Sequence, residues 1–132
     1  MYILDTTTVS DYLRGNQGII NRFRQKSFEI IYTTSITVFE LEYGLQKKPQ
    51  LRQAYAAQLD LLLRQIGCLD FDAYAATIAA AIKLQLFSVG TPISLEDVLI
   101  AAIALHHEAI VVTSNTKHFE KIVGLAIEDW TS

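Results

Sequence analysis

The chain has 132 residues, of which 51% are hydrophobic and 19% charged, and its formal net charge at pH 7 is −3. This composition excludes an intrinsically disordered chain and is sufficient for the core of one ordinary domain. No apolar run reaches the roughly 18 residues that a membrane span needs, and the first residues lack the pattern of a signal peptide. We therefore expect a single domain over residues 1–132 with no membrane attachment.

The only cysteine, Cys68, excludes an internal disulfide framework. A free thiol suits a reducing compartment, so a cytoplasmic location is expected. The net negative charge by itself argues against nucleic-acid binding, but residues 1–66 carry eight Lys/Arg and six Asp/Glu, whereas residues 67–132 carry three and eight. The basic first half is either an ordinary solvated surface or a surface for an anionic partner such as RNA.

Predicted strands and helices alternate along the chain. Apolar and β-branched segments predict strands at residues 2–4, 29–33, near 68–69, 110–113 and 125–127. Capping residues and helical spacing predict helices over residues 16–26, 37–46, 51–65, 72–88 and 94–107. This alternation favours an α/β fold with a mostly parallel central sheet and helices on both faces.

Parallel sheets of this kind bind ligands at the carboxyl ends of their strands. Asp5 follows the first predicted strand, and Glu40 lies in the first turn of the helix after the second. Asp97 lies in the first turn of the helix that Ser94 begins, and Asn115 follows the strand ending at Thr113. We expect these four side chains to converge on one edge of the sheet.

Each of the four also has a simpler interpretation as a capping residue. Asp5 and Asn115 are common at helix N-termini and turns. Glu40 can complete a capping box with Thr37, and Asp97 holds the equivalent position after Ser94. The case for a functional site therefore depends on the set and not on any single member.

Three converging carboxylates repel one another unless a cation lies among them. No Lys or Arg adjoins these positions in sequence, and no Cys or His stands in a zinc-like spacing. Hard oxygen ligands suit Mg²⁺ or Mn²⁺, and such an ion can activate water and polarise a phosphate. The set therefore favours hydrolysis of a phosphodiester.

Four segments of the chain resemble the motifs of the PIN-domain family, and within it those of the VapC-type toxins. Residues 1–6 are similar to the opening strand with the first acid, Asp5, and residues 36–44 to the second motif, with Glu40. Residues 90–102 are similar to the third motif, with Asp97, and residues 112–119 to the fourth, with Asn115. The resemblance extends in register over essentially the whole chain, including residues 124–130.

The resemblance implies a three-layer α/β/α domain that acts as an Mg²⁺-dependent endoribonuclease, with Mn²⁺ as a possible substitute. It further implies the toxin of a bacterial type II toxin–antitoxin system, which cleaves RNA, binds a cognate antitoxin over the acidic site and forms homodimers. Asp5 and Asp97 would bind the metal ion directly. Glu40 would bind it directly or through water, or would orient the attacking water.

Further side chains would support the acids. Thr6, Thr113 and Asn115 are expected to hold the acidic side chains without binding the metal ion themselves. The family usually has Asn where this chain has Thr7, and often an acid where it has Asn115. These departures keep open a catalytically weak or inactive binding module.

A different enzyme class also fits the first motif. The run of three threonines after Asp5 is similar to the nucleophile loop of haloacid-dehalogenase-type phosphatases, in which Asp5 would be the nucleophile.

Three neighbouring groups are assigned no role in the site. Glu96 adjoins Asp97 in the same predicted helix, so it is expected to point elsewhere and to be solvated. His118 has no evident partner in the sequence and is interpreted as a surface or packing residue. Phe39 and Tyr43 are interpreted as core or dimer-interface residues in preference to base-stacking ones.

Overall fold

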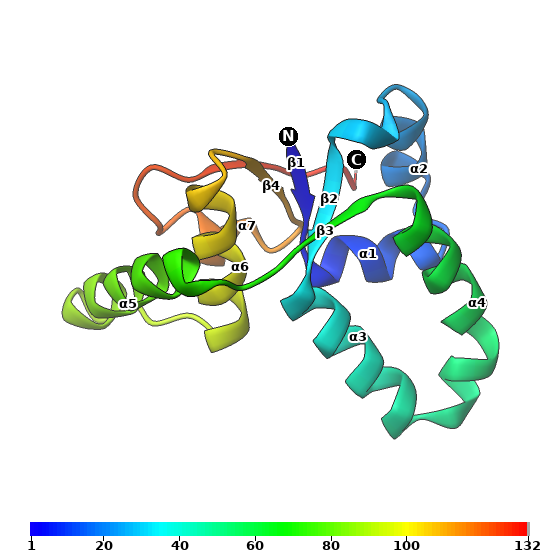
Figure 1. The fold of residues 1–132 in the computed structure, drawn as a ribbon, viewed down its shortest axis with the longest axis horizontal. Coiled ribbons are helices and arrows are strands. Elements are labelled where there is room, and N and C mark those ends of the chain that lie inside the picture. Colours follow the sequence, from blue (N-terminus) through cyan, green and yellow to red (C-terminus); the bar gives the residue numbers. More distant parts are fainter. Residues whose placement is uncertain (132) are drawn as a thin grey trace.

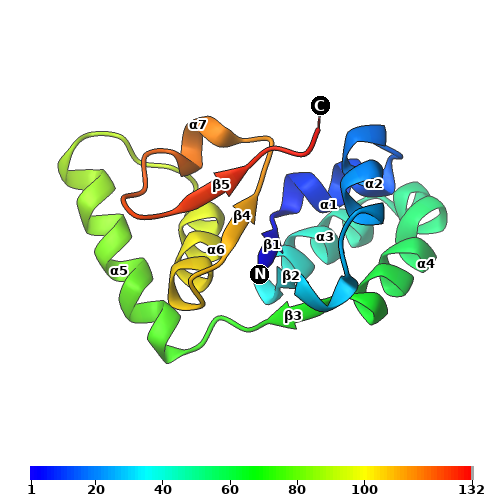
Figure 2. The same cartoon turned by 90° about the horizontal axis from the view of Figure 1, so that it is seen from above.

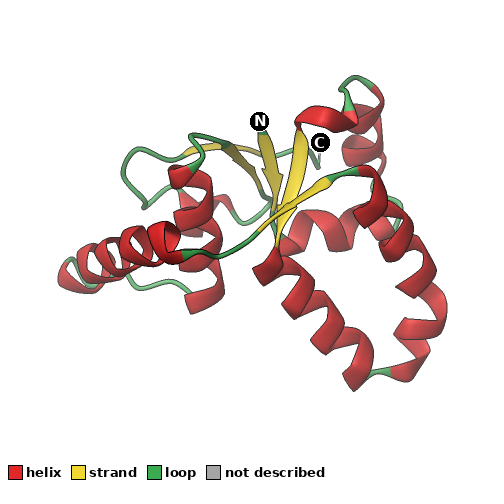
Figure 3. Cartoon of the chain, viewed as in Figure 1, coloured by secondary structure: helices red, strands yellow, loops and turns green. Residues whose placement is uncertain are grey.

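The structure, a computed structural model, describes residues 1–131 and is organised around a sheet of five short strands. The strands are Tyr2–Leu4 (β1), Ile31–Thr34 (β2), Gly67–Leu69 (β3), Ile110–Val112 (β4) and Ala126–Glu128 (β5). Every pairing is parallel, and the order across the sheet is β3-β2-β1-β4-β5 (Figure 3). The predicted parallel sheet is thus confirmed.

Each connection between successive strands contains at least one helix (Figure 1). In the described residues they are Thr6–Leu13 (α1), Gln17–Arg24 (α2), Ser35–Lys47 (α3), Pro49–Gln65 (α4), Ala73–Ser88 (α5), Leu95–His106 (α6) and Thr116–Phe119 (α7), with a 3₁₀ turn at Phe28–Ile30 (η1). The five helices predicted from the sequence are all present, with each end within two residues of its expected position. In the described part of the chain, none of these helices is both long and apolar enough to span a membrane.

The sheet separates two apolar cores. Successive strand residues point to opposite faces, so Ile3 and Val111 belong to one core and Leu4 and Val112 to the other. Helices α5, α6 and α7 cover the first face, and α1 to α4 cover the second (Figure 2). The layers are therefore helix, sheet and helix, as the sequence predicts.

The order in which the strands are added to the sheet reverses at β1. It first passes outward to β2 and β3, and then returns to the other side of β1 to form β4 and β5. The neighbouring strands β1 and β4 are consequently followed by helices on opposite faces, α1 and α7 (Figure 2). The carboxyl ends of β1 and β4 thus form the crevice in which open α/β sheets bind their ligands.

Several elements begin one or two residues away from their predicted first residue, and for β2 and α3 the structure shows the cause. The hydroxyl of Ser27 accepts a hydrogen bond from the backbone of Glu29 at 3.2 Å and stabilises the 3₁₀ turn, so β2 begins only at Ile31. Helix α3 begins at Ser35 because Thr34, and not Thr37, caps it: the Thr34 hydroxyl accepts the Thr37 N–H at 3.2 Å. Glu40 therefore lies beyond the first turn of its helix.

Two short helices, α1 and α7, were not predicted as helices. The first six residues of α1 include three threonines and a valine, whose β-branched side chains disfavour helices in isolation. The cap at Asp5 and the burial of Thr8 and Val9 outweigh this preference. Helix α7 has only four residues, too few for a periodic pattern.

Candidate active site

Asp5 lies at the carboxyl end of β1 and is almost completely buried, with 1% of its surface exposed. Its Oδ1 accepts hydrogen bonds from the Thr8 N–H and from the Thr7 hydroxyl, both at 2.9 Å. Burial raises the pKa of Asp5, while hydrogen bonds from Thr113, Thr8 and Thr7 oppose that rise. Asp5 is thus a helix cap and also a carboxylate held at the crevice, so its two interpretations are compatible.

Glu40 reaches from α3 toward α1. The Thr6 hydroxyl donates a hydrogen bond to Glu40 Oε1 at 2.5 Å and also lies 3.2 Å from the Thr37 hydroxyl. The capping box expected between Thr37 and Glu40 does not form, because the helix begins earlier and Thr34 is its cap. The glutamate is thereby directed to the same edge of the sheet as Asp5.

The electrostatics of Glu40 show that the acids lie close together. Burial raises the pKa of Glu40, and repulsion from Glu96, Asp97 and Asp5 raises it further, against the hydrogen bond from Thr6. Three acidic side chains from α6 and from the end of β1 therefore act on a fourth from α3. Asp5 and Asp97 thus lie near enough to Glu40 for their charges to act on it, but in the described residues the three acids do not stand together as a ready set of ligands.

Asp97 lies in the first turn of α6, where the Ser94 hydroxyl accepts its backbone N–H at 3.2 Å. Its Oδ2 is 2.9 Å from Nδ1 of His118 and 3.4 Å from Nδ2 of Asn115. In residues 1–131, no Lys or Arg nitrogen lies within the 4.0 Å of an ion pair from the carboxylates of Asp5, Glu40 or Asp97. The acids are therefore not neutralised by permanent basic groups.

The three supporting residues expected from the sequence each lie beside one acid. Thr6 contacts Glu40, Thr113 contacts Asp5 and Asn115 contacts Asp97. Thr113 is fully buried, and its hydroxyl also accepts the Asn115 N–H at 2.9 Å. The loop after β4 is thereby tied to the same crevice as the loop after β1.

Two residues that the sequence analysis set aside lie at the site. His118 contacts Asp97, and Glu96 is the neighbour whose charge acts most strongly on Glu40. The signal for His118 was its three-residue spacing from Asn115, which places both on one side of α7, but that helix was not evident in the sequence. From the sequence, Glu96 is expected to point away from Asp97, because adjacent residues of a helix diverge. In the structure the charge of Glu96 acts instead on Glu40, which belongs to a different helix.

Phe39 and Tyr43 flank Glu40 on α3, with exposed fractions of 63% and 60%. Together with Glu40 and Glu96, they line a shallow hollow at the surface. They are therefore not core residues, contrary to one of the expected interpretations.

The donor chemistry fits a hard divalent cation, because carboxylates that raise one another's pKa are stabilised by a positive charge among them. In the residues that the structure describes, no three acid, His or Cys side chains stand together in ligating positions. Thr6 engages Glu40, and His118 engages Asp97.

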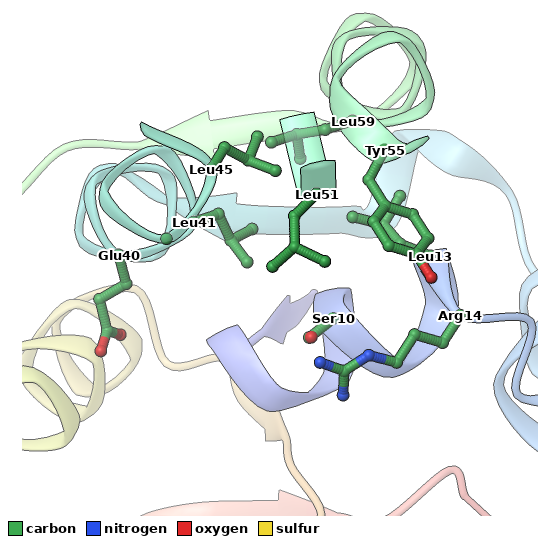
Figure 4. Close-up of a pocket in the computed structure, with 10 residues that line it drawn as sticks. Ser10, Leu13, Arg14, Glu40, Leu41, Leu45, Leu51, Tyr55 and Leu59 are labelled. Atoms are coloured by element: carbon green, nitrogen blue, oxygen red, sulfur yellow. The ribbon is translucent and has the colours of Figure 1, made fainter. Parts of the chain in front are cut away.

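An apolar groove between α1, α3 and α4 runs up to Glu40 and has a volume of about 180 Å³ (Figure 4). Its lining residues are Ser10, Leu13, Arg14, Glu40, Leu41, Gly44, Leu45, Leu51, Tyr55 and Leu59. A second hollow, between α2 and α4, shares Leu13 with the first and includes Arg24 and Lys26. Leu13 thus lies between the hollow that contains Arg24 and Lys26 and the groove that reaches Glu40.

Comparison with known proteins places this geometry in a family. The PIN domain profile matches residues 2–125. The tRNA(fMet)-specific endonuclease VapC of Shigella flexneri is 38% identical over 98 residues, which cover 74% of each chain. The enzyme of the same name from Salmonella typhimurium is 32% identical over 130 residues, covering 98% of this chain and 97% of the relative.

A solved structure shows the same fold. The toxin chain in the crystal structure of VapBC2 from Rickettsia felis, bound to a DNA fragment from their promoter, superposes with a TM-score of 0.90 and 28% sequence identity. The match covers 98% of both chains. The fold and the family predicted from the sequence motifs are confirmed.

Proposed function

The chain belongs to the PIN-domain family, and from that premise we propose that it is an Mg²⁺-dependent endoribonuclease acting as the toxin of a toxin–antitoxin pair. The observation that carries the proposal is the group of acids around Glu40 at the carboxyl end of the sheet. Within residues 1–131 none of Asp5, Glu40 and Asp97 forms an ion pair with a Lys or Arg, and the one basic group in contact with them is His118 beside Asp97. The names of the relatives, which are VapC ribonucleases, support RNA as the substrate. The VapBC2 assembly supports an antitoxin as the partner.

Asp5 and Asp97 would hold the metal ion, since each presents a carboxylate at the crevice. Bound Mg²⁺ supplies a Lewis acid that polarises the phosphate and lowers the pKa of a water molecule. Glu40, whose pKa is raised, is suited to accept a proton from the attacking water, and the Thr6 hydroxyl fixes the orientation of its carboxylate. Thr7 and the Thr8 N–H hold Asp5 in place.

The cleavage test uses purified protein, freed of any partner, with total cellular RNA. We expect discrete cleavage products with Mg²⁺, none with EDTA and none for Asp5→Asn with Mg²⁺. Asp60→Asn, an exposed aspartate on α4, is the matched control and should cleave as the wild type does. Cleavage that survives both EDTA and Asp5→Asn would contradict the proposal.

The same samples separate the two alternatives. Mg²⁺ binding by a folded wild-type chain without any RNA cleavage would indicate an inactive binding module. A covalent phosphate on Asp5, trapped by acid quenching after incubation with a phosphate monoester, would indicate a phosphatase of the haloacid-dehalogenase type.

We propose that the apolar groove between α1, α3 and α4 holds a segment of the antitoxin. Its walls are mainly leucines and Tyr55, Arg14 lies on its α1 side, and Glu40 stands at one end (Figure 4). An apolar segment followed by a basic side chain would match both features, and the basic side chain would occupy the place of the cation. Such a segment would block the acidic crevice directly.

Leu51→Glu places a charge in the groove and should abolish copurification of the cognate antitoxin from cells that express both proteins. Val123→Glu, at a site 78% exposed outside the groove, is the control and should leave the complex intact. Unchanged copurification with a folded Leu51→Glu chain would show that the antitoxin binds elsewhere.

A further inference from the structure

His118 contacts Asp97 between two elements that are far apart in sequence. Nδ1 of the imidazole lies 2.9 Å from Oδ2 of Asp97, across 21 residues of chain. Nδ2 of Asn115 lies 2.8 Å from the same ring nitrogen and 3.4 Å from the same carboxylate oxygen. The three side chains therefore form one hydrogen-bonded group at the start of α6.

The chemistry of this group determines where its proton lies. An ionised carboxylate can only accept a hydrogen bond, so Nδ1 must carry the proton that joins His118 to Asp97. With Nδ1 as the donor to Asp97, the Asn115 NH₂ cannot also donate to Nδ1. The amide group therefore either donates to Oδ2 of Asp97 alone or is turned so that its carbonyl oxygen faces Nδ1. His118 is thus a donor at Nδ1 whether the ring is neutral or charged.

The ring is carried by a firmly anchored segment. Phe119, the next residue, is fully buried in the core beneath α7. The His118 N–H is bonded to the Asn115 carbonyl at 3.2 Å, and the Asn115 N–H to the buried Thr113 hydroxyl at 2.9 Å. The backbone of His118 is therefore fixed by the end of β4 and by the core, and the half-exposed imidazole extends from this fixed backbone to Asp97.

Asp97 needs such a contact because its surroundings are repulsive. Asp97 and Glu96 are adjacent residues of α6, and the carboxylates of both repel that of Glu40. A carboxylate in such a group rotates away from its neighbours unless a donor holds it. The bond to Oδ2 fixes the side chain and leaves Oδ1 for another ligand.

We propose that His118 is a positioning residue, whose Nδ1–H holds Oδ2 of Asp97 so that Oδ1 is presented to the divalent cation. The inference rests on the proposed function of Asp97 as a metal ligand. Partners of this kind typically alter metal affinity by about 10–100-fold. The histidine takes part neither as a ligand nor as a base.

The test measures the affinity of the purified chain for Mn²⁺ alone, from the EPR signal of the free ion. His118→Ala removes the donor, and we expect binding about 10–100-fold weaker. His118→Asn places an amide nitrogen near the position of Nδ1 and should restore the affinity to within a few-fold. His118→Gln places its amide further along the side chain and should resemble His118→Ala. His107→Ala, at the C-terminus of α6, is the control and should bind as the wild type does.

A second readout needs no metal. Nitrogen NMR of the metal-free chain should show the His118 ring protonated at Nδ1, and Asp97→Ala should abolish this preference. Wild-type affinity in a folded His118→Ala chain would overturn the proposal, while loss of binding in Asp97→Asn would leave the proposed function standing. If the wild type binds no Mn²⁺, the proposed function fails, and the positioning role fails with it.

Discussion

At the scale of single residues, the site combines capping and catalysis in the same side chains. Asp5 caps α1 through the Thr8 N–H, and its burial raises its pKa. In the metal-free protein, ionisation of Asp5 therefore lowers the free energy of unfolding. The sequence predicted both roles separately, because a residue type that caps helices also binds cations.

The raised pKa of Asp5 predicts how the stability of the metal-free protein depends on pH. Because the folded-state pKa of Asp5 is raised, the folded chain binds its proton more tightly than the unfolded chain. Stability should thus fall as pH rises from the ordinary carboxyl value of about 4 through the raised one. With EDTA present, Asp5→Asn, which keeps the cap, should melt at a higher temperature than the wild type at neutral pH, and the difference should shrink in acid.

Thermal melts in a series of buffers measure this effect, and Asp60→Asn should show no such difference. Added Mg²⁺ should raise the melting temperature of the wild type but not that of Asp5→Asn. An Asp5→Asn chain less stable than the wild type at neutral pH, although folded, would mean that the carboxylate contributes to stability through its charge.

The residues that sequence reasoning missed are those whose role depends on another element. Asp5, Glu40 and Asp97 are evident from their positions after strands and at helix starts. His118 acquires its role only because α7 folds back onto the start of α6. No local pattern around His118 contains that information.

At the scale of elements, helix boundaries follow the side chain that makes the cap. The sequence predicts Thr37 as the first residue of its helix, whereas in the structure the buried Thr34 hydroxyl accepts the Thr37 N–H and caps a helix that begins at Ser35. The regular helices were predictable from spacing and caps. Helices α1 and α7 were not, since tertiary packing outweighs their weak local preference.

Two helical glycines should respond in opposite ways to substitution by alanine. A Cβ at Gly18 of α2 would lie 2.6 Å from the Trp130 carbonyl oxygen and 2.8 Å from backbone atoms of Thr131. Because backbone cannot yield easily, Gly18→Ala should cost about 1–3 kcal/mol. A Cβ at Gly44 of α3 would meet no atom within 4 Å, so Gly44→Ala should stabilise the helix by roughly 0.5–1 kcal/mol.

Urea denaturation of the two variants beside the wild type measures these differences. If Gly18→Ala were as stable as the wild type, the close approach of α2 to the chain near Trp130 would not exist in solution. If the Gly44→Ala variant were less stable than the wild type, the side of α3 at Gly44 would be in contact with other atoms of the protein.

At the scale of the whole molecule, the strand order determines where chemistry occurs. The alternation of elements predicted the α/β class, but not which strands are neighbours. The order β3-β2-β1-β4-β5 places Asp5 and Thr113 side by side, because β1 and β4 pair directly. Exposed apolar residues such as Leu84, Phe87 and Val89 near the end of α5 are compatible with homodimers, which remain a prediction.

We propose that the acids at this crevice bind a divalent cation and that the chain needs this cation to cleave RNA. The most direct test of this claim titrates Mg²⁺ into the purified chain and follows metal binding and RNA cleavage in the same samples, for the wild type, Asp97→Asn and Asp60→Asn. Cleavage should rise with Mg²⁺ occupancy in the wild type and in Asp60→Asn. In Asp97→Asn both should fall, cleavage by more than about 100-fold, because a direct ligand and not a supporting residue is lost. Cleavage by Asp97→Asn at the wild-type rate, or cleavage independent of Mg²⁺, would contradict the claim.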